Sequence, residues 1–183
     1  MKSRALFLDR DGVLNRERSF ITCPEELEIL PGVPESLATA HDKGFRLIVV
    51  SNQSGIARGL FDFEVLAQIH ARLQLGCHGL LDAIYVCPHH PSEGLEALAH
   101  TCSCRKPSSG MLLRAAREWD LDLSASLLVG DAPRDIHAAH AVGVKAICVL
   151  GEKMPHEDQW IGERPEAFVA DLAEAVTWLK PVA

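Results

Sequence analysis

The chain has 183 residues, a net charge of −7 at pH 7 and a hydrophobic fraction of 48%. This length fits one compact domain, so we expect residues 1–183 to form a single domain. The acidic balance argues against nucleic-acid binding, which needs clustered Lys and Arg side chains. No apolar run approaches the roughly 20 residues of a membrane span, and the first residues resemble no signal peptide. We therefore expect a cytoplasmic protein without a membrane partner.

Short apolar runs alternate with segments of helical period along the chain. Among the expected helices, Pro34 opens one that Gly44 closes, and Asp62 caps a second. Pro133 opens another that Gly143 closes. We expect the tail from residue 151 to 183 to complete the fold, with a contact surface as the alternative. The alternation predicts an α/β protein: a single Rossmann-like parallel sheet with helices on both faces. The length of the chain leaves no room for a second large lobe, so we expect no large cap domain. The predicted buried strands are Arg4–Leu8, Arg46–Val50, Ala83–Val86, Leu127–Val129 and Ala146–Val149.

Four polar or reactive residues directly follow predicted strands: Asp9, Ser51, Cys87 and Asp131. In an open parallel sheet, ligands bind at the edge where the carboxyl ends of the strands lie. Because every strand ends in a loop, this placement could arise by chance. The motifs around the four residues make that explanation weaker, and the sequence predicts a functional site at this edge.

The first strand ends in Asp9-Arg10-Asp11-Gly12. Residues two apart in an extended chain project to the same side, so the carboxylates of Asp9 and Asp11 should face one spot. In phosphoryl transfer, one carboxylate can attack phosphorus while the other protonates the leaving oxygen and then deprotonates water. A solvated Asp-Gly turn is the alternative for such a short motif.

A phosphate dianion beside two carboxylates requires positive charge at the same place. Asp131 can join Asp9 in holding Mg²⁺, and Lys106 can neutralise the charge that remains. The hydroxyl and backbone N–H groups of Ser51–Gly55 can bind phosphoryl oxygens. Asp135 has two interpretations, support of this site or capping of the helix in whose first turn it lies.

The segment 87–107 is too polar for a strand or helix and long for a connection. Cys87, His89, Cys102 and Cys104 supply the ligand set of a closed tetrahedral zinc site, which would be structural because it leaves no open position for water. His90 is the rival to His89, and scattered buried cysteines are the alternative to a metal site. Arg105 and Lys106 follow directly, so a bound metal would fix where these two cations lie.

The order of these motifs along nearly the whole chain resembles the haloacid dehalogenase superfamily of phosphohydrolases. The resemblance implies that Asp9 is the nucleophile and Asp11 the general acid and base. Ser51 and Lys106 would stabilise the phosphoryl group. Mg²⁺ would be bound by Asp9, the backbone carbonyl of Asp11 and Asp131.

Within that superfamily, the motifs Ser51–Gly59, Cys87–Pro91 and Cys102–Pro107 look like the D-glycero-D-manno-heptose 1,7-bisphosphate 7-phosphatase family. The resemblance implies a small phosphorylated sugar as substrate, a cytoplasmic role in making nucleotide-activated heptose for surface glycans, and a zinc-bound loop insertion. We also expect a monomer. The implied substrate contacts are Glu17, Arg18, Ser19, Phe20, Ser51, Asn52, Gln53, Ser54, Arg105 and Lys106.

Two positions depart from the family pattern. Ser51 stands where Thr is usual, which keeps the hydroxyl. Ala132 stands where many relatives carry Lys, and this change puts in doubt one charged contact near the metal.

Two other functions are compatible with part of these motifs. Histidinol-phosphate phosphatase shares the magnesium motifs and the two short motifs that carry the cysteine and histidine ligands, although its zinc loop is generally shorter. A receiver-like phospho-acceptor or binding module would use Asp9 to hold phosphate as a signal. Asp11 argues against the signalling function, because a carboxylate placed to activate water shortens the life of an acyl phosphate.

Overall fold

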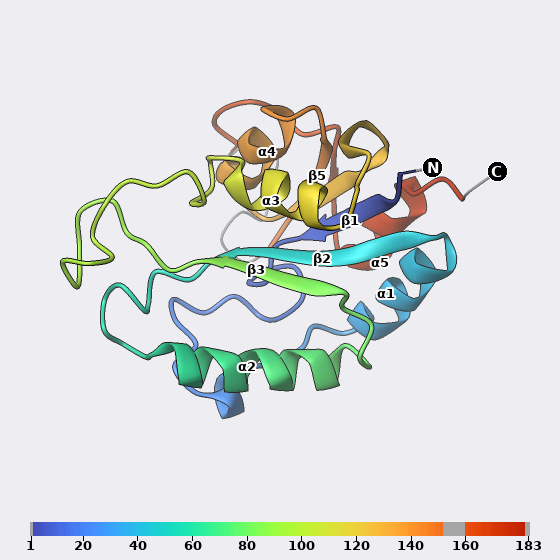
Figure 1. Cartoon of the computed structure of the whole chain (residues 1–183). Helices are drawn as coiled ribbons and strands as arrows, with labels where there is room; N and C mark the ends of the chain where they lie inside the picture. Colours follow the sequence, from blue (N-terminus) through green and yellow to red (C-terminus); the bar gives the residue numbers. More distant parts are fainter. Residues whose placement is uncertain (1, 152–159, 182–183) are drawn as a thin grey trace.

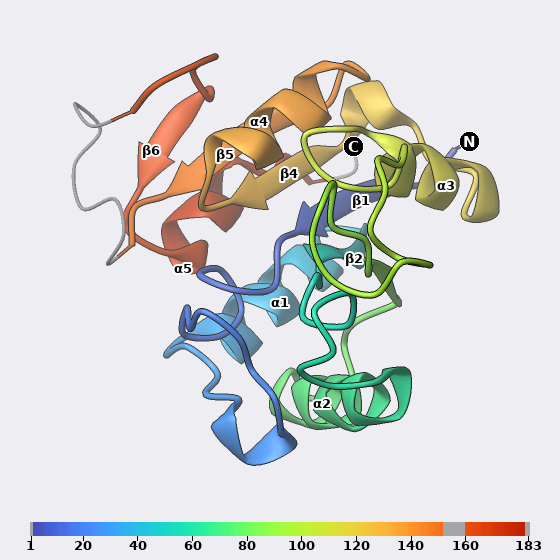
Figure 2. The same cartoon turned by 90° about the vertical axis from the view of Figure 1, so that its left-hand side faces the viewer.

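The computed structural model describes residues 2–151 and 160–181, and these residues form one six-stranded sheet (Figures 1 and 2). Its strand order is β3-β2-β1-β4-β5-β6, and every neighbouring pair is parallel. This confirms the predicted α/β fold. The strands are β1 (Arg4–Leu8), β2 (Phe45–Asn52), β3 (Ala83–Cys87), β4 (Leu127–Gly130), β5 (Lys145–Val149) and β6 (Ala167–Val169).

The strand boundaries differ from the prediction mainly at the functional edge. β2 runs on through Ser51 and Asn52, and β3 includes Cys87, so these residues end their strands instead of following them. Their side chains are polar or reactive, whereas the prediction used apolar runs alone. β6 was not predicted, because its three residues, of which only Val169 is fully buried, form too short an apolar run to indicate a strand.

The helices begin and end at the predicted signals. Asp62 caps α2, its side chain accepting a hydrogen bond from the Val65 N–H at 2.9 Å. Gly44 and Gly143 follow the ends of α1 and α4 within a few residues. The helices are α1 (Val33–Asp42), α2 (Phe63–Gly76), α3 (Gly110–Glu118), α4 (Pro133–His140) and α5 (Leu172–Ala175), with short 3₁₀ turns η1 (Pro24–Glu26), η2 (Leu123–Ala125) and η4 (Val176–Trp178).

The sheet is covered on both faces, as Figure 2 shows, with α3 and α4 on one side and α1, α2 and α5 on the other. The alternation of side chains along β1 illustrates this: Leu6 and Leu8 belong to the core below α1, whereas Ala5 and Phe7 belong to the core below α3 and α4. Burial on both faces explains why the strands are almost continuously apolar. The edge that carries the polar residues is therefore built on a rigid layer.

The carboxyl ends of the strands meet at one edge, with β1 between β2 and β4. The loop between β3 and α3 leaves the sheet at this edge and projects from it in Figure 1. The tail forms β6, α5 and η4 beside β5, apart from residues 152–159 and 182–183, which lie outside the described part of the chain. None of the helices described is long and apolar enough to span a bilayer.

Candidate active site

Asp9 lies at the centre of the edge, directly after β1, and its side chain is buried. Its backbone N–H donates to the Val129 carbonyl at 2.9 Å, which holds it between β1 and β4. The Oδ1 atom accepts hydrogen bonds from the Arg10 N–H at 2.7 Å and from Lys106 Nζ at 2.9 Å. Oδ2 lies 3.9 Å from Nη2 of Arg134. One oxygen is thus fixed by donors, while the other has only this looser contact with a cation.

Three carboxylates gather beside Asp9: its own and those of Asp131 and Asp135, with oxygen atoms within 4.8 Å of one another. The Asp131 side chain packs directly against residue 12, and this position requires glycine, because a Cβ there would lie 2.3 Å from Asp131 Oδ2. The Oδ1 atom of Asp131 is buried and accepts no hydrogen bond from the described residues. Burial, and then the charges of Asp9 and Asp135, raise the pKa of Asp131 to about 7.

An unsatisfied buried carboxylate oxygen among like charges fits a cation site, and carboxylates are the ligands that Mg²⁺ uses in proteins. Asp9 Oδ2 and Asp131 Oδ1 have only longer contacts with Arg134 Nη2, at 3.9 and 3.6 Å. Asp135 is different, because both of its oxygens have nitrogen neighbours: Oδ2 accepts from the Ala132 N–H at 3.1 Å, and Oδ1 lies 2.6 Å from Lys106 Nζ. Asp135 therefore combines the two roles that the sequence left open, since it caps the first turn of α4 and supports the site through Lys106.

Lys106 is fully buried, and its ammonium group reaches three oxygens. Nζ lies 2.9 Å from Asp9 and 2.6 Å from Asp135, and it donates to the Val50 carbonyl at 2.7 Å. Burial by itself favours the neutral amine, but the adjacent charges of Asp135 and Asp9 outweigh it and raise the pKa of Lys106. The side chain thus places a permanent positive charge beside the candidate nucleophile.

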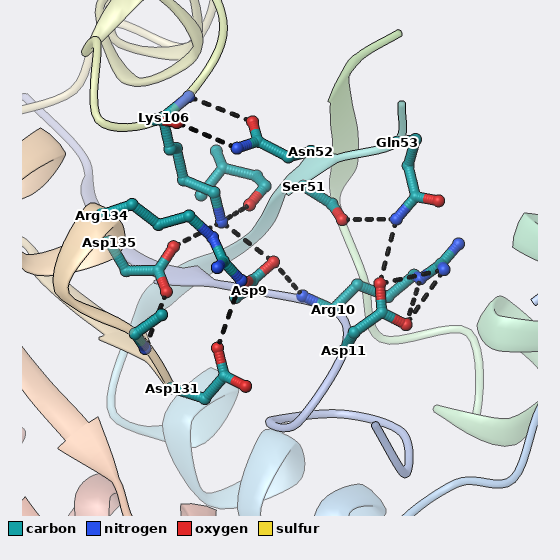
Figure 3. A network of polar contacts seen from close by, with 12 residues as sticks. Asp9, Arg10, Asp11, Ser51, Asn52, Gln53, Lys106, Asp131, Arg134 and Asp135 are labelled. Atoms are coloured by element: carbon teal, nitrogen blue, oxygen red, sulfur yellow. Dashed lines mark hydrogen bonds and ion pairs between the residues drawn. The ribbon is translucent and has the colours of Figure 1, made fainter. Parts of the chain in front are cut away.

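Asn52 fixes the backbone of Lys106 (Figure 3). Its Nδ2 donates to the Lys106 carbonyl at 3.0 Å, and its Oδ1 accepts from the Lys106 N–H at 3.0 Å. These two hydrogen bonds connect the end of β2 to the end of the loop that carries the cysteines, residues 87–107. The amide group of Asn52 is therefore already engaged with the protein.

Asp11 is held on the opposite side of Asp9 from Asp135 (Figure 3). The Arg10 guanidinium contacts both of its oxygens at 3.0 Å, Asn15 Nδ2 donates to Oδ1 at 2.9 Å, and Gln53 Nε2 donates to Oδ2 at 3.0 Å. Arg10 and Asn15 were not predicted as site residues. Arg10 lies between Asp9 and Asp11 in the sequence, and this position could have marked it as a site residue. The direction of its side chain, however, depends on the turn after β1.

A polar cavity of about 200 Å³ opens between the two carboxylates of the first motif. Most predicted substrate contacts line it, together with Arg134, which was not predicted. Phe20, Gln53 and Lys106 are absent from its walls: Gln53 and Lys106 are buried, and Phe20 packs 5.7 Å below the Arg58 guanidinium. The walls are formed by Asp9, Asp11, Glu17, Arg18, Ser19, Ser51, Asn52, Ser54, Arg105 and Arg134.

A second cavity, of about 310 Å³, shares Glu17 with the first and is also lined by Asp131. Its other walls are mainly aliphatic, from residues such as Val13, Leu30 and Leu172. The polar cavity is smaller, but its serine, asparagine and arginine side chains suit a phosphorylated ligand better.

The four predicted zinc ligands come together in the loop after β3. The Sγ atoms of Cys87, Cys102 and Cys104 lie 3.2–3.5 Å apart, and His89 Nδ1 lies 3.3 Å from Cys104 and 3.6 Å from Cys87. Zinc bonds of about 2.0–2.3 Å in a tetrahedron give ligand separations of roughly 3.3–3.8 Å, so the geometry fits a closed zinc site. His90 points elsewhere, 3.2 Å from Arg58.

The cysteine cluster is fastened to the active-site edge by hydrogen bonds. Arg105 Nη1 donates to the His89 carbonyl at 3.1 Å, and the Gln53 N–H donates to the Cys87 carbonyl at 2.7 Å. Lys106 follows Arg105 and enters the core. A metal in the cluster would therefore fix both cations relative to Asp9.

Comparisons with known proteins agree with this geometry. A family model described as HAD-hydrolase-like matches residues 103–175. The D-glycero-beta-D-manno-heptose-1,7-bisphosphate 7-phosphatase of Photorhabdus laumondii is 37% identical over 181 residues, with 96% of each chain covered. The Escherichia coli K12 protein of the same name is 38% identical over 177 residues, covering 94% of this chain and 93% of its own.

Solved structures give the same result. The D,D-heptose 1,7-bisphosphate phosphatase of B. bronchiseptica, complexed with magnesium and phosphate, superposes with a TM-score of 0.84 at 34% identity, covering 96% of this chain and 97% of its own. The corresponding protein of Burkholderia thailandensis has a TM-score of 0.68 at 27% identity, covering 96% and 97%. The chain belongs to the heptose 1,7-bisphosphate phosphatase family of HAD-like hydrolases.

Proposed function

We propose that this chain is a magnesium-dependent phosphomonoesterase that removes the C7 phosphate of D-glycero-D-manno-heptose 1,7-bisphosphate. The observation that carries the proposal is the arrangement around Asp9, whose carboxylate lies with that of Asp131 in a group that could hold a cation and contacts the buried ammonium of Lys106. The names of the bacterial relatives supply the substrate.

In this proposal the carboxylate of Asp9 attacks phosphorus, and the bond between phosphorus and the C7 oxygen breaks. Asp11 gives its proton to that departing oxygen, which leaves as the sugar alcohol. Asp11 then takes a proton from water as the water attacks the aspartyl phosphate, which releases inorganic phosphate and restores the Asp9 carboxylate and the protonated Asp11. Lys106 and the Ser51 hydroxyl stabilise the charge on the phosphoryl oxygens throughout.

Asp9, Asp131 and the backbone carbonyl of Asp11 would hold Mg²⁺, which supplies charge neutralisation for the phosphoryl group when bound. Arg134 adds a cation to the same side, 3.6 Å from Asp131. Since Ala132 lacks the charge that the family pattern has at that position, Arg134 is the residue of this chain that can compensate for it.

The polar cavity would take the sugar, with Glu17, Arg18, Ser19 and Arg105 among its lining residues. Ser54 would contact the substrate from the loop after β2. Cys87, His89, Cys102 and Cys104 would hold a structural Zn²⁺ that orders Arg105. Cysteine ligands of this kind suit a reducing compartment, so we place the enzyme in the cytoplasm. We further propose that it is a monomer with a single domain.

The test is a steady-state comparison of the purified protein on both anomers of heptose 1,7-bisphosphate and on histidinol phosphate, with magnesium present. We expect the highest kcat/KM on one anomer of the heptose bisphosphate, with phosphate released from C7. A higher kcat/KM on histidinol phosphate would contradict the proposal. Asp9→Asn serves as the inactive control, because an amide cannot form the aspartyl phosphate.

A further inference from the structure

Gln53 lies beneath the polar cavity instead of lining it. The residue is 5% exposed, and its backbone N–H is bound to the Cys87 carbonyl. Its side-chain nitrogen makes two contacts inside the protein: Nε2 donates to Asp11 Oδ2 at 3.0 Å and to Ser51 Oγ at 2.8 Å (Figure 3). An amide nitrogen has two hydrogens, so both of its donors are used.

The contact with Ser51 determines how its hydroxyl is oriented. A hydroxyl has one donor and two acceptor lone pairs. Because Ser51 Oγ accepts from Gln53, its own proton remains available as a donor, and Ser51 lines the cavity where the phosphoryl group would lie. Gln53 thus makes the hydroxyl a donor toward an anion.

The contact of Gln53 with Asp11 opposes the contact that Arg10 makes with the same carboxylate. Arg10 contacts both oxygens of Asp11, and both of its contributing nitrogens lie on the side away from Asp9 in Figure 3. Gln53 binds Oδ2 from the direction of Ser51, so it restrains the carboxylate on the side where the phosphoryl group would lie. Arg10, which is 1% exposed, and Gln53 together leave Asp11 little rotational freedom.

We propose that Gln53 is a positioning residue that aligns the acid Asp11 and the hydroxyl of Ser51 with one another through a single amide nitrogen. This inference rests on the proposed function, since it assigns Asp11 to protonation of the leaving oxygen. It also assigns Gln53 a different task from direct contact with the sugar.

The test compares substrates that differ in their need for an acid. An alkyl phosphate releases an alcohol, whose oxygen must be protonated as it departs, whereas p-nitrophenyl phosphate releases a stable phenolate that needs no proton. The ratio kcat/KM covers only the steps up to departure of the leaving group, so slow hydrolysis of the aspartyl phosphate does not affect it. We would measure it for heptose 1,7-bisphosphate, glycerol phosphate and p-nitrophenyl phosphate.

Gln53→Met keeps the length of the side chain and removes both donors. We expect kcat/KM to fall about 10- to 100-fold on both alkyl phosphates, and several-fold less on p-nitrophenyl phosphate, as part of the roughly 10²- to 10⁴-fold contribution of general acid catalysis. Asp11→Asn should show the same selectivity with a larger loss. Gln68→Met, an exposed glutamine on α2, is the matched control and should resemble the parent protein.

Other outcomes would overturn the inference. A rise in KM confined to heptose 1,7-bisphosphate, with glycerol phosphate unaffected, would make Gln53 a sugar ligand. An equal loss on all three substrates would indicate a general structural role, which circular dichroism and the unfolding midpoint of Gln53→Met would register. Failure of the parent protein on the heptose substrate, with activity on the other two retained, would refute the proposed substrate but leave this comparison intact.

Discussion

Replacing Lys106 by methionine removes one buried positive charge and leaves the side chain's volume nearly unchanged. The ammonium lies within 2.9 Å of Asp9 and within 2.6 Å of Asp135, both largely shielded from water. Breaking a buried ion pair by removing one partner costs about 3–5 kcal/mol, because the remaining charge is left without compensation. We therefore expect Lys106→Met to lower the free energy of unfolding by about this amount in buffer without added magnesium.

Magnesium should restore part of this loss. The cluster of Asp9, Asp131 and Asp135 becomes more negative when Lys106 is removed, so it should bind a divalent cation more tightly, and binding to the native state stabilises it. We expect added Mg²⁺ to raise the unfolding midpoint further for Lys106→Met than for the parent protein. Turnover should remain about 10²- to 10³-fold lower even with magnesium, since the charge beside the phosphoryl group is missing.

The assay is urea unfolding followed by circular dichroism, with and without Mg²⁺. No chelator is added, because a chelator would also remove any metal held by the cysteine cluster. Lys145→Met, at an exposed position at the start of β5, is the matched control. If Lys106→Met were as stable as Lys145→Met in the absence of magnesium, the ammonium would not be compensating the two carboxylates. Equal magnesium-induced shifts in Lys106→Met and the parent protein would refute the electrostatic coupling.

Three further predictions follow from the same geometry. Burial, followed by the charges of Asp9 and Asp135, raises the pKa of Asp131 from 3.8 to about 7. Between these two pH values, the native state therefore holds a proton on Asp131 that the unfolded state has lost. The stability of the magnesium-free protein should therefore fall as pH rises from about 4 to about 7, by up to about 1.4 kcal/mol per pH unit from this group, and Asp131→Asn should flatten the unfolding profile. Cys104→Ser should lose most of the bound zinc, measured by elemental analysis, and lower the melting temperature. Arg134→Met should lower kcat/KM on the substrate about tenfold with little change in the unfolding midpoint, because its side chain is 45% exposed and surface ion pairs contribute little to stability.

The sequence was sufficient for the features that follow from local pattern. β1 and the cap of α2 were predicted because an apolar run and an Asp before a helix are local signals. The candidate zinc ligands were likewise predicted from residue type and spacing, and the structure brings all four side chains together: Cys87, His89, Cys102 and Cys104. What no local pattern contains is the direction of a polar side chain at the end of a strand.

Asn52 and Gln53 illustrate this limit. Both belong to the motif after the apolar part of β2, and both were expected to contact substrate. In the structure their amide groups bind other site residues, Asn52 the backbone of Lys106 and Gln53 the side chains of Asp11 and Ser51. These partners are up to 54 residues away in sequence. The parallel register of β1 and β2 brings Gln53 close to Asp11, and the return of the loop after β3 brings Lys106 close to Asn52.

The charges around Asp9 explain why the site needs its metal for anion binding and for chemistry alike. Asp9, Asp131 and Asp135 carry three negative charges when ionised, whereas Lys106 and Arg134 carry two positive ones. Asp11 is set apart from this balance, because Arg10 pairs with it. One negative charge remains uncompensated, and it would repel a phosphate dianion in a cavity of low dielectric. A divalent cation held by Asp9 and Asp131 would reverse the sign of the site. The same charge would reduce the repulsion of the phosphoryl group and so allow the carboxylate of Asp9 to approach phosphorus.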